Sequence, residues 1–137
     1  MESIVVQDLE RRYGVVHAVR GIGFEVAEGE VFAFLGPNGA GKTTTISILC
    51  TLLSPTAGRA RVSGHDVVSE RPAVRRAIGV VFQEPTLDEQ LTAEQNLRFH
   101  AMAYGVPREV AARRMDELLE LVGLAERRGD RVRTYSG

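Results

Sequence analysis

The sequence predicts an α/β fold, and three features of the chain predict it. Runs rich in valine and isoleucine fill its beginning, a glycine-rich loop follows at 36–41, and later stretches carry apolar residues at helical spacing. With 137 residues, 44% of them apolar, the chain is long enough to bury one core without disulfide or metal staples. We therefore expect a single ordinary globular unit.

Several strands are expected along the first two thirds of the chain. Residues 3–9 and 16–26 predict an antiparallel pair, and Glu30–Leu35 predicts a buried strand that leads into the loop. A short strand is expected near Arg59–Val62. Ile78–Phe82 is an unbroken apolar run, which is typical of a parallel strand buried on both faces.

Three helices are expected from the periodicity. Lys42–Leu53 is apolar on most sides, which indicates a central helix. Thr92 and Gln95 have the spacing of a capping box, and Pro107 suits the first turn of the next helix, which Gly123 should end. The stripes of the two later helices are Leu97, Ala101 and Tyr104, then Ala111, Met115, Leu118, Leu119 and Val122.

Composition excludes several classes of protein. A net charge of −1 gives no general attraction to nucleic acid or anionic lipid, and the single cysteine, Cys50, excludes a disulfide scaffold. The longest apolar runs have five residues, far short of the roughly 20 that a membrane-spanning helix needs. No secretory signal follows Met1, so the expected compartment is the cytoplasm. The charged cluster Glu126–Arg133 is interpreted as a solvated connection, with anion binding as the alternative.

The loop from Gly36 to Thr43 carries the chemistry, because it fits G-x-x-x-x-G-K-[ST] in full between a predicted strand and a predicted helix. Its glycines allow backbone N–H groups to approach a phosphate closely, and the start of the helix favours negative charge. Of 17 basic residues only Lys42 is lysine, and it occupies the position that reaches the β- and γ-phosphates. Thr43 offers a hydroxyl to Mg²⁺, and Thr44 a further hydrogen bond.

Two other interpretations of this loop are weaker. A plain glycine-rich turn that caps a helix would not explain the lysine. A dinucleotide-binding loop needs a third glycine, and Gly39-Ala40-Gly41 is followed by Thr44 instead.

With the loop in place, the whole chain resembles the ATP-binding subunit of ABC transporters. Tyr13 matches the aromatic residue that stacks on adenine, and Gln83 matches the glutamine that contacts Mg²⁺ and the attacking water. Residues 87–92, together with 96–97 and 104–107, look like the daunorubicin-resistance branch of drug exporters. Tyr135-Ser136-Gly137 resembles the opening of the signature motif, at which the sequence given stops.

The resemblance implies a P-loop core with an antiparallel β-subdomain and a helical subdomain, incomplete at the C-terminus. It divides the chain into 1–83, the β-subdomain with the P-loop core, and 84–137, the glutamine loop with the helical subdomain. It implies Mg²⁺-ATP as ligand, with Lys42 and Gln83 in catalysis and Thr43 and Gln83 at the metal. The nucleotide contacts it implies are Tyr13, Gly36, Pro37, Asn38, Gly39, Ala40, Gly41, Lys42, Thr43, Thr44, Ser136 and Gly137.

The implied partners are a membrane permease, which would dock near 84–104, and a second ATP-binding subunit, with no nucleic acid. The location would be the inner face of the cell membrane. Because the family's Walker B strand and switch histidine would lie beyond Gly137, we expect negligible hydrolysis by this chain alone. His17, His65 and His100 match no family position and are interpreted as surface or packing residues.

The alternatives are a soluble ABC ATPase of translation or DNA repair, a silent nucleotide-binding module and, third, a nucleotide kinase.

Overall fold

The computed structural model describes residues 2–81 and 86–135. The chain divides into two compact units, Met1–Val81 and Phe82–Gly137, and each is described by itself. No helix within 2–81 or 86–135 is long and apolar enough to cross a membrane.

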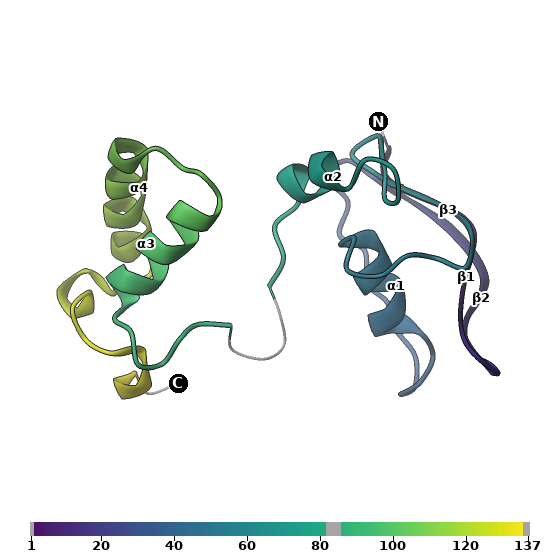
Figure 1. The fold of residues 1–137 in the computed structure, drawn as a ribbon, viewed down its shortest axis with the longest axis horizontal. Coiled ribbons are helices and arrows are strands. Elements are labelled where there is room, and N and C mark those ends of the chain that lie inside the picture. Colours follow the sequence, from purple (N-terminus) through teal and green to yellow (C-terminus); the bar gives the residue numbers. More distant parts are fainter. Residues whose placement is uncertain (1, 82–85, 136–137) are drawn as a thin grey trace. The chain divides into compact units, whose positions relative to one another are not determined.

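The first unit is built on a curved antiparallel sheet (Figure 1). Its strands are β1 (Glu2–Tyr13), β2 (Val16–Ala27), β3 (Ala57–Val62) and β4 (His65–Asp66), in the order β2-β1-β3-β4. Tyr13 pairs with Val16, so β1 and β2 form a hairpin with a two-residue turn. The antiparallel pair and the short strand near 59–62 predicted from the sequence are therefore confirmed.

Two helices accompany this sheet, α1 (Lys42–Leu49) and α2 (Arg71–Ala77). The core joins both helices to the strands, and Leu9, Ile48 and Val74 are fully buried in it. Burying such side chains stabilises the fold by about 1.5–3 kcal/mol each. The core is what fixes α1, and with it the preceding glycine-rich loop, against the sheet.

The helix after the loop is shorter and less buried than predicted. It ends at Leu49 rather than Leu53, because Thr51 has a positive φ of 63° and breaks the helical backbone. Only one side of α1 is buried, because Ile46 is exposed, and Leu52 in the segment after the helix is exposed too. The α2 helix has no counterpart in the sequence-based prediction.

Neither predicted buried strand of the core is present. Residues 30–35 and 78–81 are irregular, and Val31, Leu35 and Val81 are 98%, 91% and 99% exposed; Phe82 lies outside the described residues. A parallel strand needs hydrogen-bonded neighbours, and within 2–81 and 86–135 no strand pairs with either segment. Phe32 and Phe34 nevertheless pack on Phe24 of β2, with ring centroids 5.1 Å away in each case.

The second unit consists of the helices α3 (Ala93–Ala103) and α4 (Arg108–Leu121), with the short 3-10 helices η1 (Ala125–Arg127) and η2 (Val132–Thr134) (Figure 1). The capping box of Thr92 and Gln95 is confirmed, with both of its hydrogen bonds present. The α4 helix starts one residue after Pro107 and ends before Gly123, whose φ is 70°.

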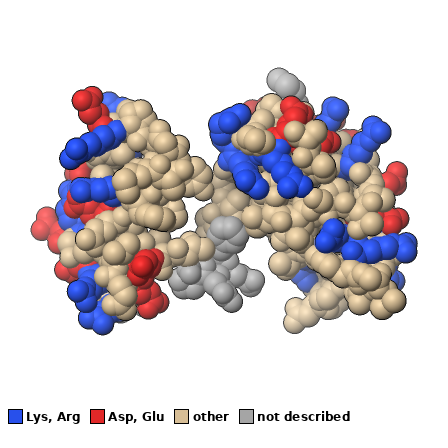
Figure 2. Space-filling view, viewed as in Figure 1, with Lys and Arg blue, Asp and Glu red and all other residues tan. Residues whose placement is uncertain are grey.

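The apolar stripes of this unit are only partly buried. Ala111, Met115 and Leu119 are buried as predicted, but Leu118, Val122 and Tyr104 are exposed. Figure 2 shows basic and acidic side chains next to each other along one edge of this unit, beside a broad uncharged face.

The cluster at 126–133 is more than a solvated connection. Arg128 contacts Glu94 at 3.1 Å and Asp116 at 2.9 Å, so it ties the last segment to both helices.

Candidate nucleotide site

The site is built on the loop between residues 36 and 41. Gly36, Gly39 and Gly41 have φ values of 152°, 83° and 85°, which are disfavoured for residues with a Cβ. The loop therefore has the backbone conformation for which its glycines were predicted to be needed.

Gly41 also meets a steric limit. A Cβ on this residue would lie 2.3 Å from the carbonyl oxygen of Ala18 and 3.3 Å from Cγ2 of Val19. The loop is thus packed directly against β2, and only glycine fits at the point of contact.

Lys42 is folded back over the loop. Its Nζ donates hydrogen bonds to the carbonyl oxygens of Gly36 at 2.6 Å and Pro37 at 2.7 Å. An ammonium group has three donors, so one of them is left for a ligand. The loop carbonyls hold the positive charge in place before any anion arrives.

The start of α1 is open to a ligand. No side chain caps it, and Gly41 is its N-cap residue, so the N–H groups of the first turn lack a side-chain partner. Thr43 is exposed and Thr44 is half-buried, whereas buried Thr45 donates its hydroxyl hydrogen to the Gly41 carbonyl at 2.9 Å. Thr45 is therefore structural, and Thr43 and Thr44 are free to take the roles predicted for them.

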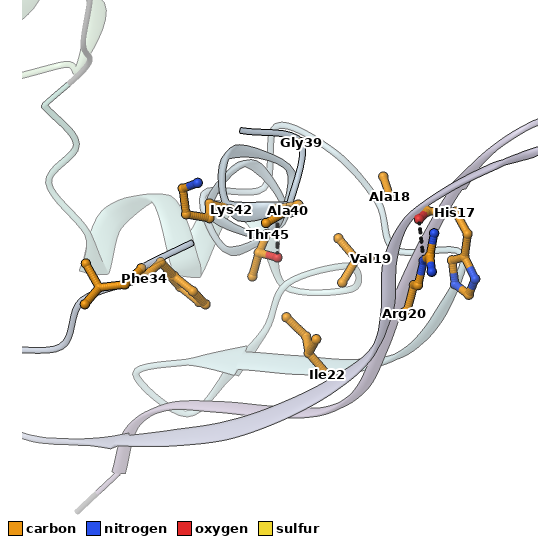
Figure 3. A pocket seen from close by; sticks show the side chains of 12 residues that line it. His17, Ala18, Val19, Arg20, Ile22, Phe34, Gly39, Ala40, Lys42 and Thr45 are labelled. Atoms are coloured by element: carbon orange, nitrogen blue, oxygen red, sulfur yellow. Dashed lines mark hydrogen bonds between the residues drawn. The ribbon is translucent and has the colours of Figure 1, made fainter. Parts of the chain in front are cut away.

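A cavity of about 390 Å³ lies between β2 and the loop. Its size falls in the range of small-molecule sites. In Figure 3 Val19 and Ile22 lie between β2 and α1, while Lys42 and His17 lie on opposite sides of them. The lining residues come from β2, from 34–35 and from the loop: His17, Ala18, Val19, Arg20, Ile22, Phe34, Leu35, Gly39, Ala40, Gly41, Lys42 and Thr45.

Tyr13 is at the tip of the β1–β2 hairpin. The residue is 44% exposed, and the guanidinium carbon of Arg11 lies 4.6 Å from its ring centroid. The structure thus presents an accessible aromatic ring with a cation against it.

His17 lines the site, although from the sequence it was interpreted as a surface or packing residue. Its ring lines the cavity, its side chain is 24% exposed, and its Nε2 lies 3.3 Å from the Glu10 carboxylate. No spacing in the sequence points to this residue, because the contact of the neighbouring Ala18 carbonyl with Gly41 of the loop exists only in the folded chain.

Three predicted site residues, Gln83, Ser136 and Gly137, lie outside the described residues. Pro37, Asn38 and Ala40 are exposed on the loop itself.

Within residues 2–81 and 86–135 no three His, Cys, Asp or Glu side chains gather as a metal site. Mg²⁺ does not need such a cluster, because it keeps several waters and takes substrate phosphate oxygens as ligands. The exposed hydroxyl of Thr43, at the start of α1, fits that mode of binding.

Burial raises the pKa of the Cys50 thiol, so this cysteine is a poor nucleophile.

Comparison with known proteins identifies the family to which the chain belongs. Residues 19–137 match the family described as ABC transporter. The chain belongs to the ABC transporter family. The glycine-rich loop at 36–43 lies within the residues that match this family.

Individual relatives agree with the family assignment. The chain is 48% identical to the daunorubicin resistance ATP-binding protein of Streptomyces coeruleorubidus, over 98% of this chain and 43% of that protein. It is 41% identical to the linearmycin resistance ATP-binding protein of Bacillus subtilis, over 96% of this chain and 42% of that protein. The chain thus spans about two fifths of the length of these ABC proteins.

Solved structures confirm the α/β fold class. An ATP-binding subunit of an ABC transporter has 33% sequence identity and a TM-score of 0.81, over 97% of this chain and 55% of the solved one. A protein of Clostridium perfringens that is part of an ABC transporter complex gives a TM-score of 0.84 at 28% identity, over 98% and 56%.

Proposed function

We propose that this chain forms the nucleotide-binding part of an ATP-binding subunit that powers an ABC exporter. The observation that carries the proposal is Lys42, whose ammonium is held over the loop carbonyls at 2.6 and 2.7 Å beside an uncapped helix start. A triphosphate entering the cavity would meet one remaining lysine donor and the N–H groups of the first turn of α1. These groups favour an anion even though the whole chain has a net charge of −1.

The remaining parts of the nucleotide have candidate partners as well. Tyr13 would stack on the adenine, a contact that contributes about 1–3 kcal/mol for bases on aromatic rings. The Thr43 hydroxyl would hold Mg²⁺, which neutralises phosphate charge when bound. Gln83 is proposed as the residue that senses the γ-phosphate, together with Ser136 and Gly137 as the start of a signature motif.

Export is the transport direction that the relatives favour. The two curated relatives described above are named for resistance to daunorubicin and to linearmycin, and both are ATP-binding proteins. We propose that the complete protein works as a dimer of ATP-binding subunits with a membrane permease, on the cytoplasmic face of the membrane. Hydrolysis belongs to that assembly.

Substituting Lys42 tests the proposal. Lys42→Ala in the complete gene product should weaken both Mg²⁺-ATP and inorganic tripolyphosphate by about 10-fold or more, because charge-assisted hydrogen bonds are worth about 1.5–3 kcal/mol. Isothermal titration calorimetry measures both affinities. Lys42→Arg keeps the charge but not the compact ammonium, so it should not restore binding.

The matched control is Arg59→Ala, which removes an exposed cation on β3 and should leave both affinities unchanged. Unchanged affinity in folded Lys42→Ala would overturn the proposal.

A further inference from the structure

The side chain of Arg11 connects two parts of the first unit. Its Cζ lies over the Tyr13 ring, 4.6 Å from the centroid, and its Nη1 donates to the carbonyl oxygen of Ser54 at 2.9 Å. The side chain is half-buried, and its Nε is buried without a hydrogen-bond partner among the described residues. The guanidinium is therefore held between a carbonyl anchor and an aromatic ring.

The anchor itself is fixed. Ser54 belongs to the segment that follows α1, and two residues later the Thr56 N–H donates to the Glu10 carbonyl at 2.8 Å. The N–H of Arg12 donates to Thr56 Oγ1 at 3.0 Å. Hydrogen bonds thus hold the end of β1 against the segment after α1, and the Arg11 side chain contacts Tyr13 from this position.

The Tyr13 ring keeps one face for another planar group. A guanidinium stacked on an aromatic ring covers one of its two faces, and the residue is still 44% exposed. We propose that Arg11 is a positioning residue for the nucleotide base, holding the Tyr13 ring with its open face ready to stack on adenine. This inference rests on the proposed role of Tyr13 in the ATP site.

The consequence is specific to the base. A ring that is already held loses less conformational freedom when a ligand stacks on it. Arg11 is not among the residues that line the cavity beside the loop, so it should strengthen binding of the nucleoside part and leave the phosphates unaffected. ATP and inorganic tripolyphosphate differ in that nucleoside part.

The experiment compares these two ligands in the complete gene product. Arg11→Gln should raise the Kd of Mg²⁺-ATP by about 2- to 5-fold, the magnitude of a partly exposed cation–π contact, and leave the Kd of tripolyphosphate unchanged. In a Tyr13→Ala background the same substitution should have no further effect on ATP, since the ring on which it acts is gone.

The neighbouring arginine supplies the control. The Arg12 side chain is 55% exposed and lies 3.5 Å from the Glu10 carboxylate, so Arg12→Gln removes the same charge without touching Tyr13. It should leave both affinities at the wild-type value.

Two results overturn the inference. One is an ATP affinity in Arg11→Gln equal to that of Arg12→Gln. The other is an equal loss for ATP and tripolyphosphate, which would mean that Arg11 acts on the loop through Ser54. If Arg11→Gln does not fold, Arg11→Lys keeps a cation and a donor but loses the planar stack, and an unchanged ratio of the two affinities then overturns it.

Failure of the proposed function looks different. In that case Lys42→Ala would leave both ligands bound as in the wild type, whatever Arg11 does.

Discussion

Lys42 and Gly41 show how single residues make this site. The lysine is held by carbonyl groups of its own loop, and the glycine lets that loop touch β2. Both residue types were predictable from the motif. The roles of Arg11 and His17 were not, because the Ser54 carbonyl that anchors Arg11 and the cavity that His17 lines are formed only where β1, β2 and the segment after α1 come together.

At the scale of single residues, Gly39 and Gly41 offer a matched pair of substitutions. Gly39 and Gly41 have nearly equal φ values of 83° and 85°, but only a Cβ on Gly41 would meet an atom of β2. Gly39→Ala should cost about 1 kcal/mol of stability through backbone strain. Gly41→Ala should cost about 1–3 kcal/mol more, as in other overpacked positions, and should weaken ATP binding as well.

Denaturant unfolding and calorimetry of the two variants check this prediction. Equal losses of stability would show that the contact between the loop and Ala18 does not constrain the protein.

At the scale of elements, the connection between β4 and α2 is held by reciprocal hydrogen bonds. The Asp66 carboxylate accepts from the N–H groups of Ser69 and Val68, each at 2.9 Å, and the Asp66 N–H donates to Glu70 at 2.9 Å. These N–H donors, that of Ser69 first, lower the pKa of Asp66. The pKa of Glu70 is lowered too, mainly by the N–H of Asp66.

This connection predicts a dependence of stability on pH. A carboxyl group whose pKa is lowered by folding stabilises the protein above its unfolded pKa of about 4, and that contribution is lost as the pH falls through the lower folded value. Asp66→Asn should therefore make the free energy of unfolding less dependent on pH below about 4. Urea unfolding between pH 7 and the acid range measures it.

Glu109→Gln, on the exposed surface of α4, is the control. A pH profile of Asp66→Asn that overlies the wild-type profile would contradict the prediction.

The elements also show where a pattern alone fails. The segments 30–35 and 78–81 have the composition of buried strands, yet they are irregular because no described strand pairs with them. The Thr92 capping box was predictable because both partners lie within four residues of each other, whereas a strand depends on a neighbour far away in the sequence.

At the scale of the whole molecule, the chain covers 43% and 42% of its two resistance relatives. The boundary at 83/84 stays a prediction, although the chain separates into compact units between Val81 and Phe82.

The share of its relatives' length that the chain covers leads to a prediction about the ATPase activity of this chain by itself. Because the chain covers 43% and 42% of these two relatives, we expect it to bind ATP weakly and to hydrolyse it at least about 10²-fold more slowly than the full-length daunorubicin resistance relative, a difference of the size that a positioned general base contributes. Phosphate release under multiple-turnover conditions measures both rates. Equal turnover by the two proteins would contradict this expectation, and Lys42→Ala of this chain sets the background.

The sequence by itself determined the glycine-rich loop, the place of its lysine, the hairpin before it and the Thr92 capping box, because each depends on residues a few positions apart. Only the tertiary structure decided which strand the loop packs against, which residues line the cavity and which carbonyl anchors Arg11 beside the Tyr13 ring. Arg11 and the Ser54 carbonyl that anchors it lie 43 residues apart, and no local spacing encodes such a contact. The physical reason is that burial and strand pairing act between surfaces, and the surfaces exist only after the chain has folded.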